Sequence, residues 1–151
     1  MTTTSLDGQR AWVFGGTSGI GLACAQALAE AGVQVVVAGR SRQRLQAALA
    51  RLPPGVRGEG LDAGDGAALR AALARHGAID HVVVSIGGAS ALGPYRQLDE
   101  EALRRTFENK FWQVQRATLA ALPHMVTDSP SASVTWITGA AARAAMPGMS
   151  A

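Results

Sequence analysis

This 151-residue chain has few of the sequence features that disulfides, membrane spans and nucleic-acid-binding surfaces require. Its one cysteine, Cys24, excludes an internal disulfide and a cysteine-rich zinc site. No apolar run approaches the roughly 20 residues that a membrane-spanning helix needs. The net charge of +3 comes from arginines spread along the chain, whereas a nucleic-acid surface needs its cations on one face. We therefore expect neither a nucleic-acid nor a membrane partner.

Metal-binding and targeting signals are missing as well. The histidines, His76, His81 and His124, do not have the spacing of metal ligands, so we expect no metal site. The first ten residues, MTTTSLDGQR, contain neither a basic segment nor an apolar one. We accordingly expect no secretory signal and a cytoplasmic location. The length corresponds to one domain.

Short apolar runs alternate with longer amphipathic segments along the whole chain. Strands are predicted at 11–14, 33–38, 56–62, 81–85 and 133–138. Helices are predicted at 20–31, from a cap at Ser41 to before Pro53, at about 66–76, and from Asp99 to about 122. Such alternation implies right-handed crossovers and a parallel sheet covered on both faces. The predicted fold class is α/β: a doubly wound parallel sheet (Rossmann fold) of three α/β/α layers with strand order 3-2-1-4-5.

A glycine-rich loop joins the first predicted strand to the first predicted helix. Residues 12–21 read WVFGGTSGIG, in which Gly15, Gly19 and Gly21 form the pattern G-x-x-x-G-x-G. This pattern lets the backbone turn sharply and approach a pyrophosphate held at the helix N-terminus. A turn kept only for tight packing is the alternative, and a Walker loop is excluded because no Gly-Lys-Ser/Thr follows. The residues predicted here to contact a cofactor are Gly15, Thr17, Ser18, Gly19, Ile20 and Gly21.

The end of the second predicted strand carries the signal for the cofactor's identity. An acid about 20 residues past the glycine loop indicates NAD, whereas arginine there accommodates the 2′-phosphate of NADP. Arg40, Ser41 and Arg42 stand at this place with no acid among them. The sequence therefore predicts NADP rather than NAD, with charge-assisted hydrogen bonds to the phosphate. Exposed arginines on a first helical turn are the alternative.

These features resemble the short-chain dehydrogenase/reductase family. GGTSGIG matches the coenzyme motif T-G-x-x-x-G-x-G of that family from its second residue on, with Phe14 in place of the usual threonine. The resemblance covers essentially all 151 residues, which look like the first three-fifths of a typical member. It implies that residues 1–151 are an NADP-binding Rossmann domain, the N-terminal part of such a dehydrogenase, with the C-terminal catalytic segment absent from this chain.

The resemblance also assigns cofactor contacts further along the chain. LDAGD looks like the family's D-V/L-x-D stretch, so Asp62 would bond the adenine amino group with the backbone of Ala63 beside it. VVVSIGGAS stands where the family has N-N-A-G, so Ser85, Ile86 and Gly87 would line the cofactor.

Catalysis in the family depends on Asn, Ser, Tyr and Lys, and this chain matches that set only in part. FENKFWQVQRA resembles the helix that carries the asparagine, which would be Asn109, although an ordinary polar helix position is the alternative. The serine position falls on Gly139, with Thr138 and Ser150 as nearby hydroxyls. The only tyrosine, Tyr95, and the only lysine, Lys110, do not form Tyr-x-x-x-Lys.

The function implied by the resemblance is that of an NADP(H)-dependent oxidoreductase. It would transfer hydride between nicotinamide and a small carbonyl or alcohol substrate. The alternative is an NADP-binding sensor or interaction module without catalysis, and the sequence leaves open whether the chain is a fragment or such a module. An unpaired fifth strand also predicts a homo-oligomer, a dimer or a tetramer.

Overall fold

The computed structural model describes residues 5–87 and 94–139, and these contain a five-stranded parallel sheet. Its strands are β1 (Arg10–Phe14), β2 (Gln34–Gly39), β3 (Arg57–Gly60), β4 (His81–Val84) and β5 (Ser133–Trp136). Their order in the sheet is β3-β2-β1-β4-β5. This confirms the predicted doubly wound order, and all five predicted strands are present with slightly shifted ends.

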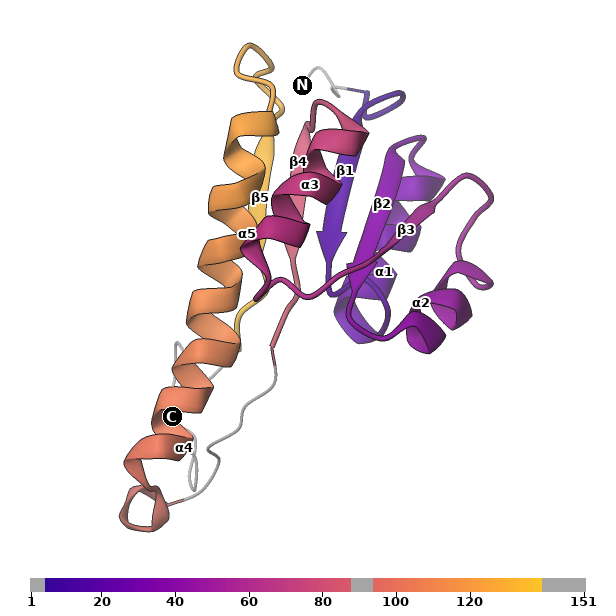
Figure 1. Ribbon diagram of the computed structural model, residues 1–151. Coiled ribbons are helices and arrows are strands. Elements are labelled where there is room, and N and C mark those ends of the chain that lie inside the picture. Colours follow the sequence, from indigo (N-terminus) through magenta and orange to yellow (C-terminus); the bar gives the residue numbers. More distant parts are fainter. Residues whose placement is uncertain (1–4, 88–93, 140–151) are drawn as a thin grey trace.

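Helices cover both faces of this sheet. They are α1 (Gly19–Glu30), α2 (Arg42–Leu49), α3 (Gly66–His76), α4 (Glu100–Phe107) and α5 (Gln113–Ala121), with 3-10 turns at Tyr95–Gln97 and Leu122–His124. α3 and α5 lie side by side over one face, the near one in Figure 1, and α1 and α2 pack on the other. α4 extends away from the sheet at the end to which the strand arrows point (Figure 1).

The core consists of two apolar layers, one on each side of the sheet. Along β1, Trp12 and Phe14 join the layer under α3 and α5, whereas Ala11 and Val13 join the layer under α1 and α2. All four side chains are buried. Because each strand residue packs on one face or the other, β1, β2 and β4 are apolar after their first residue, as strands of covered parallel sheets are.

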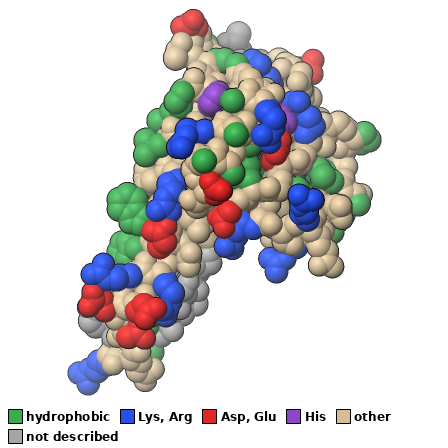
Figure 2. Space-filling model, viewed as in Figure 1, with side chains coloured by type: hydrophobic (Ala, Val, Ile, Leu, Met, Phe, Trp, Pro, Cys, Tyr) green, Lys and Arg blue, Asp and Glu red, His purple; other side chains and the backbone are tan. Residues whose placement is uncertain are grey.

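The helix predicted from Asp99 to about 122 is present but not uniform. A π-helical turn, Glu108–Trp112, separates α4 from α5, so one long rod consists of three helical segments. A π turn takes about one residue more than an α turn, and apolar periodicity does not register a change of this size. Acidic and basic side chains stand beside one another over α4 in Figure 2, in keeping with the ion pairs Glu100–Arg104 and Glu101–Arg105.

Candidate functional site

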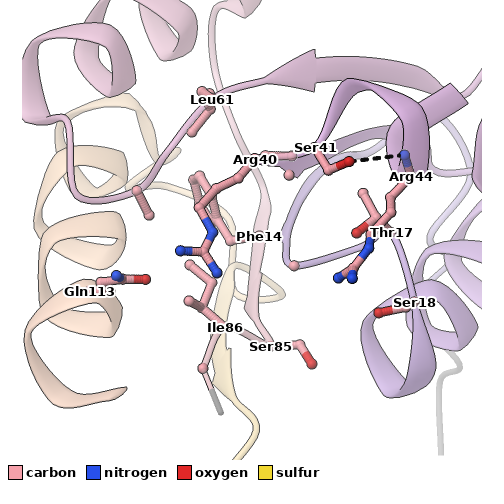
Figure 3. Close-up of a pocket in the computed structure, with 15 residues that line it drawn as sticks. Phe14, Thr17, Ser18, Arg40, Ser41, Arg44, Leu61, Ser85, Ile86 and Gln113 are labelled. Carbon is pink, nitrogen blue, oxygen red and sulfur yellow. Dashed lines mark hydrogen bonds between the residues drawn. The ribbon is translucent and has the colours of Figure 1, made fainter. Parts of the chain in front are cut away.

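A cavity of about 410 Å³ opens at the carboxyl ends of the strands. It lies where the strand order reverses between β1 and β4, which is where open α/β sheets bind their ligands. The carboxyl ends of the strands, the loops that follow them, α2 and α5 contribute to it (Figure 3). The lining residues are Phe14, Gly15, Thr17, Ser18, Ala38, Gly39, Arg40, Ser41, Arg44, Leu61, Ala63, Ser85, Ile86, Gly87 and Gln113.

The glycine loop packs tightly against the end of β4. Gly15 has a φ of +78°, and a Cβ atom there would collide with the carbonyl oxygen of Ser85. A Cβ atom at Gly21 would collide in turn with the carbonyl of Gly15. Both positions therefore require glycine, and the requirement brings the loop backbone directly to the wall of the cavity.

The N-terminus of α1 differs from those of α2, α3 and α4. Ser18 is the N-cap of α1, but its side chain makes no capping hydrogen bond. The first turn of α1 carries no acidic residue, as is also true of α2 and α3. The other three helices are capped by the side chains of Ser41, Asp65 and Asp99. Helix N-terminal N–H groups carry partial positive charge and favour anions. The open end of α1 at the cavity is thus suited to a phosphate group.

Two arginines supply further positive charge. Figure 3 shows the guanidinium of Arg40 extending past Phe14 and Ile86, and that of Arg44 near Thr17. Neither arginine takes part in an ion pair among residues 5–87 and 94–139. The Ser41 hydroxyl accepts a hydrogen bond from the backbone N–H of Arg44 at 3.3 Å, which fixes the first turn of α2 beside the cavity.

The structure brings most, but not all, of the predicted cofactor residues into this cavity. Those that line it are Gly15, Thr17, Ser18, Arg40, Ser41, Ala63, Ser85, Ile86 and Gly87. Those outside its lining are Gly19, Ile20, Gly21, Arg42 and Asp62. The carboxylate of Asp62 accepts a hydrogen bond from the N–H of Gly64 at 2.9 Å and so shapes its own turn.

Six lining residues are not among those predicted from the sequence, namely Phe14, Ala38, Gly39, Arg44, Leu61 and Gln113. For Arg44 a signal existed, because it lies three residues after the N-cap Ser41 and so returns to the same side of the helix. Gln113 carries no such signal, since it enters the cavity from α5, about 70 residues along the chain from α2.

The residues considered for catalysis lie around the π turn and the end of β5. Asn109 is partly buried within the turn and accepts a hydrogen bond from the Gln113 side chain at 3.4 Å. Thr138 and Gly139 follow β5 and are exposed, whereas Ser150 lies outside the described residues. Tyr95 begins a 3-10 turn ahead of α4, and Lys110 adjoins Asn109.

Within residues 5–87 and 94–139, no three residues among histidine, cysteine, aspartate and glutamate gather as a metal site would require. No helix in that part of the chain combines the length and the apolar character needed to cross a bilayer.

Comparison with known proteins gives consistent matches. The family model for short chain dehydrogenase matches residues 9–151. D-erythrulose reductase of Gallus gallus is 30% identical over 142 residues, which are 94% of this chain and 57% of that protein. L-xylulose reductase of Mus musculus is 36% identical over 102 residues, which are 68% of this chain and 41% of that protein.

A solved structure extends the comparison to the fold. The short chain dehydrogenase from Burkholderia cenocepacia J2315, in complex with NADP, matches with a TM-score of 0.81 at 27% identity. The match covers 97% of this chain and 61% of that one. The chain therefore spans less than two thirds of the length of each of these three proteins.

Proposed function

Because the chain belongs to the short-chain dehydrogenase/reductase family, we propose that residues 1–151 form the NADP(H)-binding domain of an oxidoreductase. The reaction is hydride transfer between nicotinamide and a small carbonyl or alcohol substrate. One observation carries the proposal: an uncapped helix N-terminus and two arginines without ion-pair partners in the described residues share one cavity. NADP carries a 2′-phosphate in addition to its pyrophosphate, and these two anionic groups match this distribution of positive charge.

The residues present fit such a cofactor. The loop backbone at Gly15 and the N-terminus of α1 would hold the pyrophosphate, since Gly15 and Ser18 line the cavity and no side chain caps the helix. Arg40 and Arg44 would hold the 2′-phosphate. Leu61 gives the cavity an apolar surface suited to the adenine. When bound, the cofactor supplies the hydride chemistry, and the protein supplies binding and orientation.

The direct test is a comparison of NADPH and NADH binding by isothermal titration calorimetry. We expect NADPH to bind about tenfold more tightly or better, because charge-assisted hydrogen bonds to the phosphate are each worth about 1.5–3 kcal/mol. Equal or tighter binding of NADH would contradict the NADP assignment. Failure to bind either nucleotide would contradict the proposal as a whole.

A second candidate function is an NADP-binding sensor or interaction module without catalysis. It is favoured by Gly139, which stands at the position that the resemblance gives to the family's serine. Consumption of NADPH with a panel of ketones separates the two functions. Erythrulose and xylulose belong in the panel, because two relatives are named as reductases of these sugars.

We also propose that the protein forms a homo-oligomer. Large apolar side chains are exposed along the rod formed by α4, the π turn and α5, and a groove there is lined partly by Phe107, Phe111 and Trp112. Packing of this rod against a second copy would remove the three side chains from water. Among the residues that the structure describes, β3 and β5 are the edge strands of the sheet, and they offer a second place for association.

A further inference from the structure

Lys110 lies between two backbone segments that leave the sheet. Its Nζ atom donates a hydrogen bond to the carbonyl oxygen of Ile86, two residues past β4, at 3.2 Å. It donates another to the carbonyl oxygen of Ile137, the residue after β5, at 3.0 Å. The side chain is half-buried. Two of the three ammonium donors are thus used to join the carboxyl ends of two neighbouring strands.

These two hydrogen bonds connect the segments after β4 and β5, just beyond the point where the pairing of the two strands ends. The ladder of β4 and β5 runs to the pair Val84↔Trp136, and the N–H of Ile137 then donates to the Val84 carbonyl at 3.0 Å. Beyond that point Lys110 supplies the connection between the two segments. Hydrogen bonds from a charged donor are worth more than those between neutral groups, so this connection is a strong one.

The π turn presents Lys110 to the strand ends. Lys110 is the central residue of Glu108–Trp112, and the extra residue of a π turn changes the direction in which side chains leave the helix. Glu108 forms an ion pair with Arg116 on α5, and the hydrogen bond between them raises the pKa of Arg116. Single π turns within helices occur frequently at functional sites.

The side chain of Lys110 lies directly against Gly87, which lines the cavity. A Cβ atom at Gly87 would lie 2.7 Å from Cδ of Lys110 and 3.3 Å from the carbonyl oxygen of Asn109. Gly87 has a φ of +114°, and it lines the cavity together with Ile86. The lysine stem therefore occupies the space beside Gly87, and its ammonium holds the carbonyl of Ile86.

We propose that Lys110 is a positioning residue for the dinucleotide cavity. It fixes the Ile86–Gly87 wall by tying it to Ile137, and it acts through these backbone groups rather than by touching the ligand. The effect on binding rests on the NADP(H) function proposed above, whereas the connection between the strand ends is a property of the protein alone. The two parts are therefore tested by separate measurements.

The first measurement is amide hydrogen exchange without nucleotide, followed by NMR or mass spectrometry. In Lys110→Met, which removes the donors and keeps much of the length of the side chain, we expect the amide of Ile137 to exchange roughly tenfold faster. Amides of β1 and β2 should keep their rates. Lys110→Arg restores donors and should recover most of the protection, and Arg104→Met, a control on exposed α4, should behave as the wild type.

The second measurement is NADPH affinity for the same four proteins. Lys110→Met should weaken binding roughly tenfold, with recovery in Lys110→Arg and no change in Arg104→Met. Unchanged Ile137 exchange, or faster exchange spread equally over β1 and β2, would overturn the proposal. If the methionine variant does not fold, Lys110→Gln provides a neutral donor for the same comparison. A wild-type protein that binds no dinucleotide would refute the proposed function, while the exchange data still decide the role of Lys110 in the strand ends.

Discussion

At the scale of single residues, the charge of the cavity depends on Arg40 and Arg44. Neither has an acidic partner among the described residues, so both guanidinium groups are available to a phosphate. We predict that Arg40→Ala and Arg44→Ala each weaken NADPH binding about tenfold, because each removes charge-assisted hydrogen bonds. NADH binding should change little, since it has no 2′-phosphate. Calorimetric titration with both nucleotides measures the difference.

Arg70, exposed on α3 and outside the cavity lining, gives the matched control. Arg70→Ala should leave both affinities unchanged. An equal loss of NADPH and NADH affinity in the Arg40 or Arg44 variants would show that the arginine holds another part of the nucleotide.

Ser18 gives a second prediction at this scale. An aspartate at the N-cap of α1 would occupy the open helix end with a carboxylate. We expect Ser18→Asp to stabilise the nucleotide-free protein by about 0.3–1 kcal/mol through the helix dipole. The same charge should weaken NADPH binding more than tenfold, because it would repel the pyrophosphate. Thermal unfolding with and without NADPH tests both effects, and Ser18→Asn is the neutral control. Unaltered NADPH affinity in the aspartate variant would place the pyrophosphate elsewhere.

At the scale of elements, the N-terminal cap of α3 stabilises the fold from a position outside the cavity lining. The Asp65 side chain caps this helix and accepts hydrogen bonds from the N–H groups of Ala67 and Ala68, each at 3.0 Å. We predict that Asp65→Ala lowers the free energy of unfolding by about 1 kcal/mol. Urea unfolding measures this loss. NADPH affinity should be unchanged, and Asp65→Asn should retain most of the stability; a matching loss of affinity would mean that the cap also shapes the cavity.

The helical rod α4–α5 owes little of its stability to its exposed ion pairs. Glu100–Arg104 and Glu101–Arg105 have an i,i+4 spacing and lie in solvent, where such a pair contributes about 0.3–0.5 kcal/mol. Packing of α5 against the sheet contributes more, since Val114 and Ala117 are buried there. α4 has no buried residue of its own, and its main contacts within the described residues are with the π turn that follows it.

At the scale of the whole molecule, the exposed side chains of the rod predict association. Phe107 is 61% exposed and Trp112 is 51% exposed, which is unusual for side chains of this size. We predict that the double variant Phe107→Glu/Trp112→Glu lowers the mass in solution to that of a monomer, because like charges would face each other across the contact. Size-exclusion chromatography with light scattering measures the mass.

Gln43→Glu, an added charge on exposed α2, serves as the control for this prediction and should leave the mass unchanged. If the double variant keeps the mass of the wild type, association uses another surface, such as an edge of the sheet. A wild-type protein that is monomeric at all concentrations would contradict the proposed oligomer.

The sequence by itself determined the strand order, the covered parallel sheet and the place of the glycine loop. These follow from local patterns: apolar runs of strand length, helix caps and stops, and glycines at the turn from β1 to α1. Arg40 and Ser41 were also found from the sequence, because their positions relative to β2 are fixed by a few residues of chain. Their contact with a nucleotide remains a prediction.

The tertiary structure alone decided how distant segments meet. Gln113 reaches the cavity from α5, and Lys110 reaches Ile86 and Ile137, residues 24 and 27 positions away. A π turn fixes these contacts by shifting the helix by about one residue, a change too small for apolar periodicity to reveal. Such contacts depend on the packing of the helix against the sheet, and packing is a property of the assembled fold rather than of any short stretch of sequence.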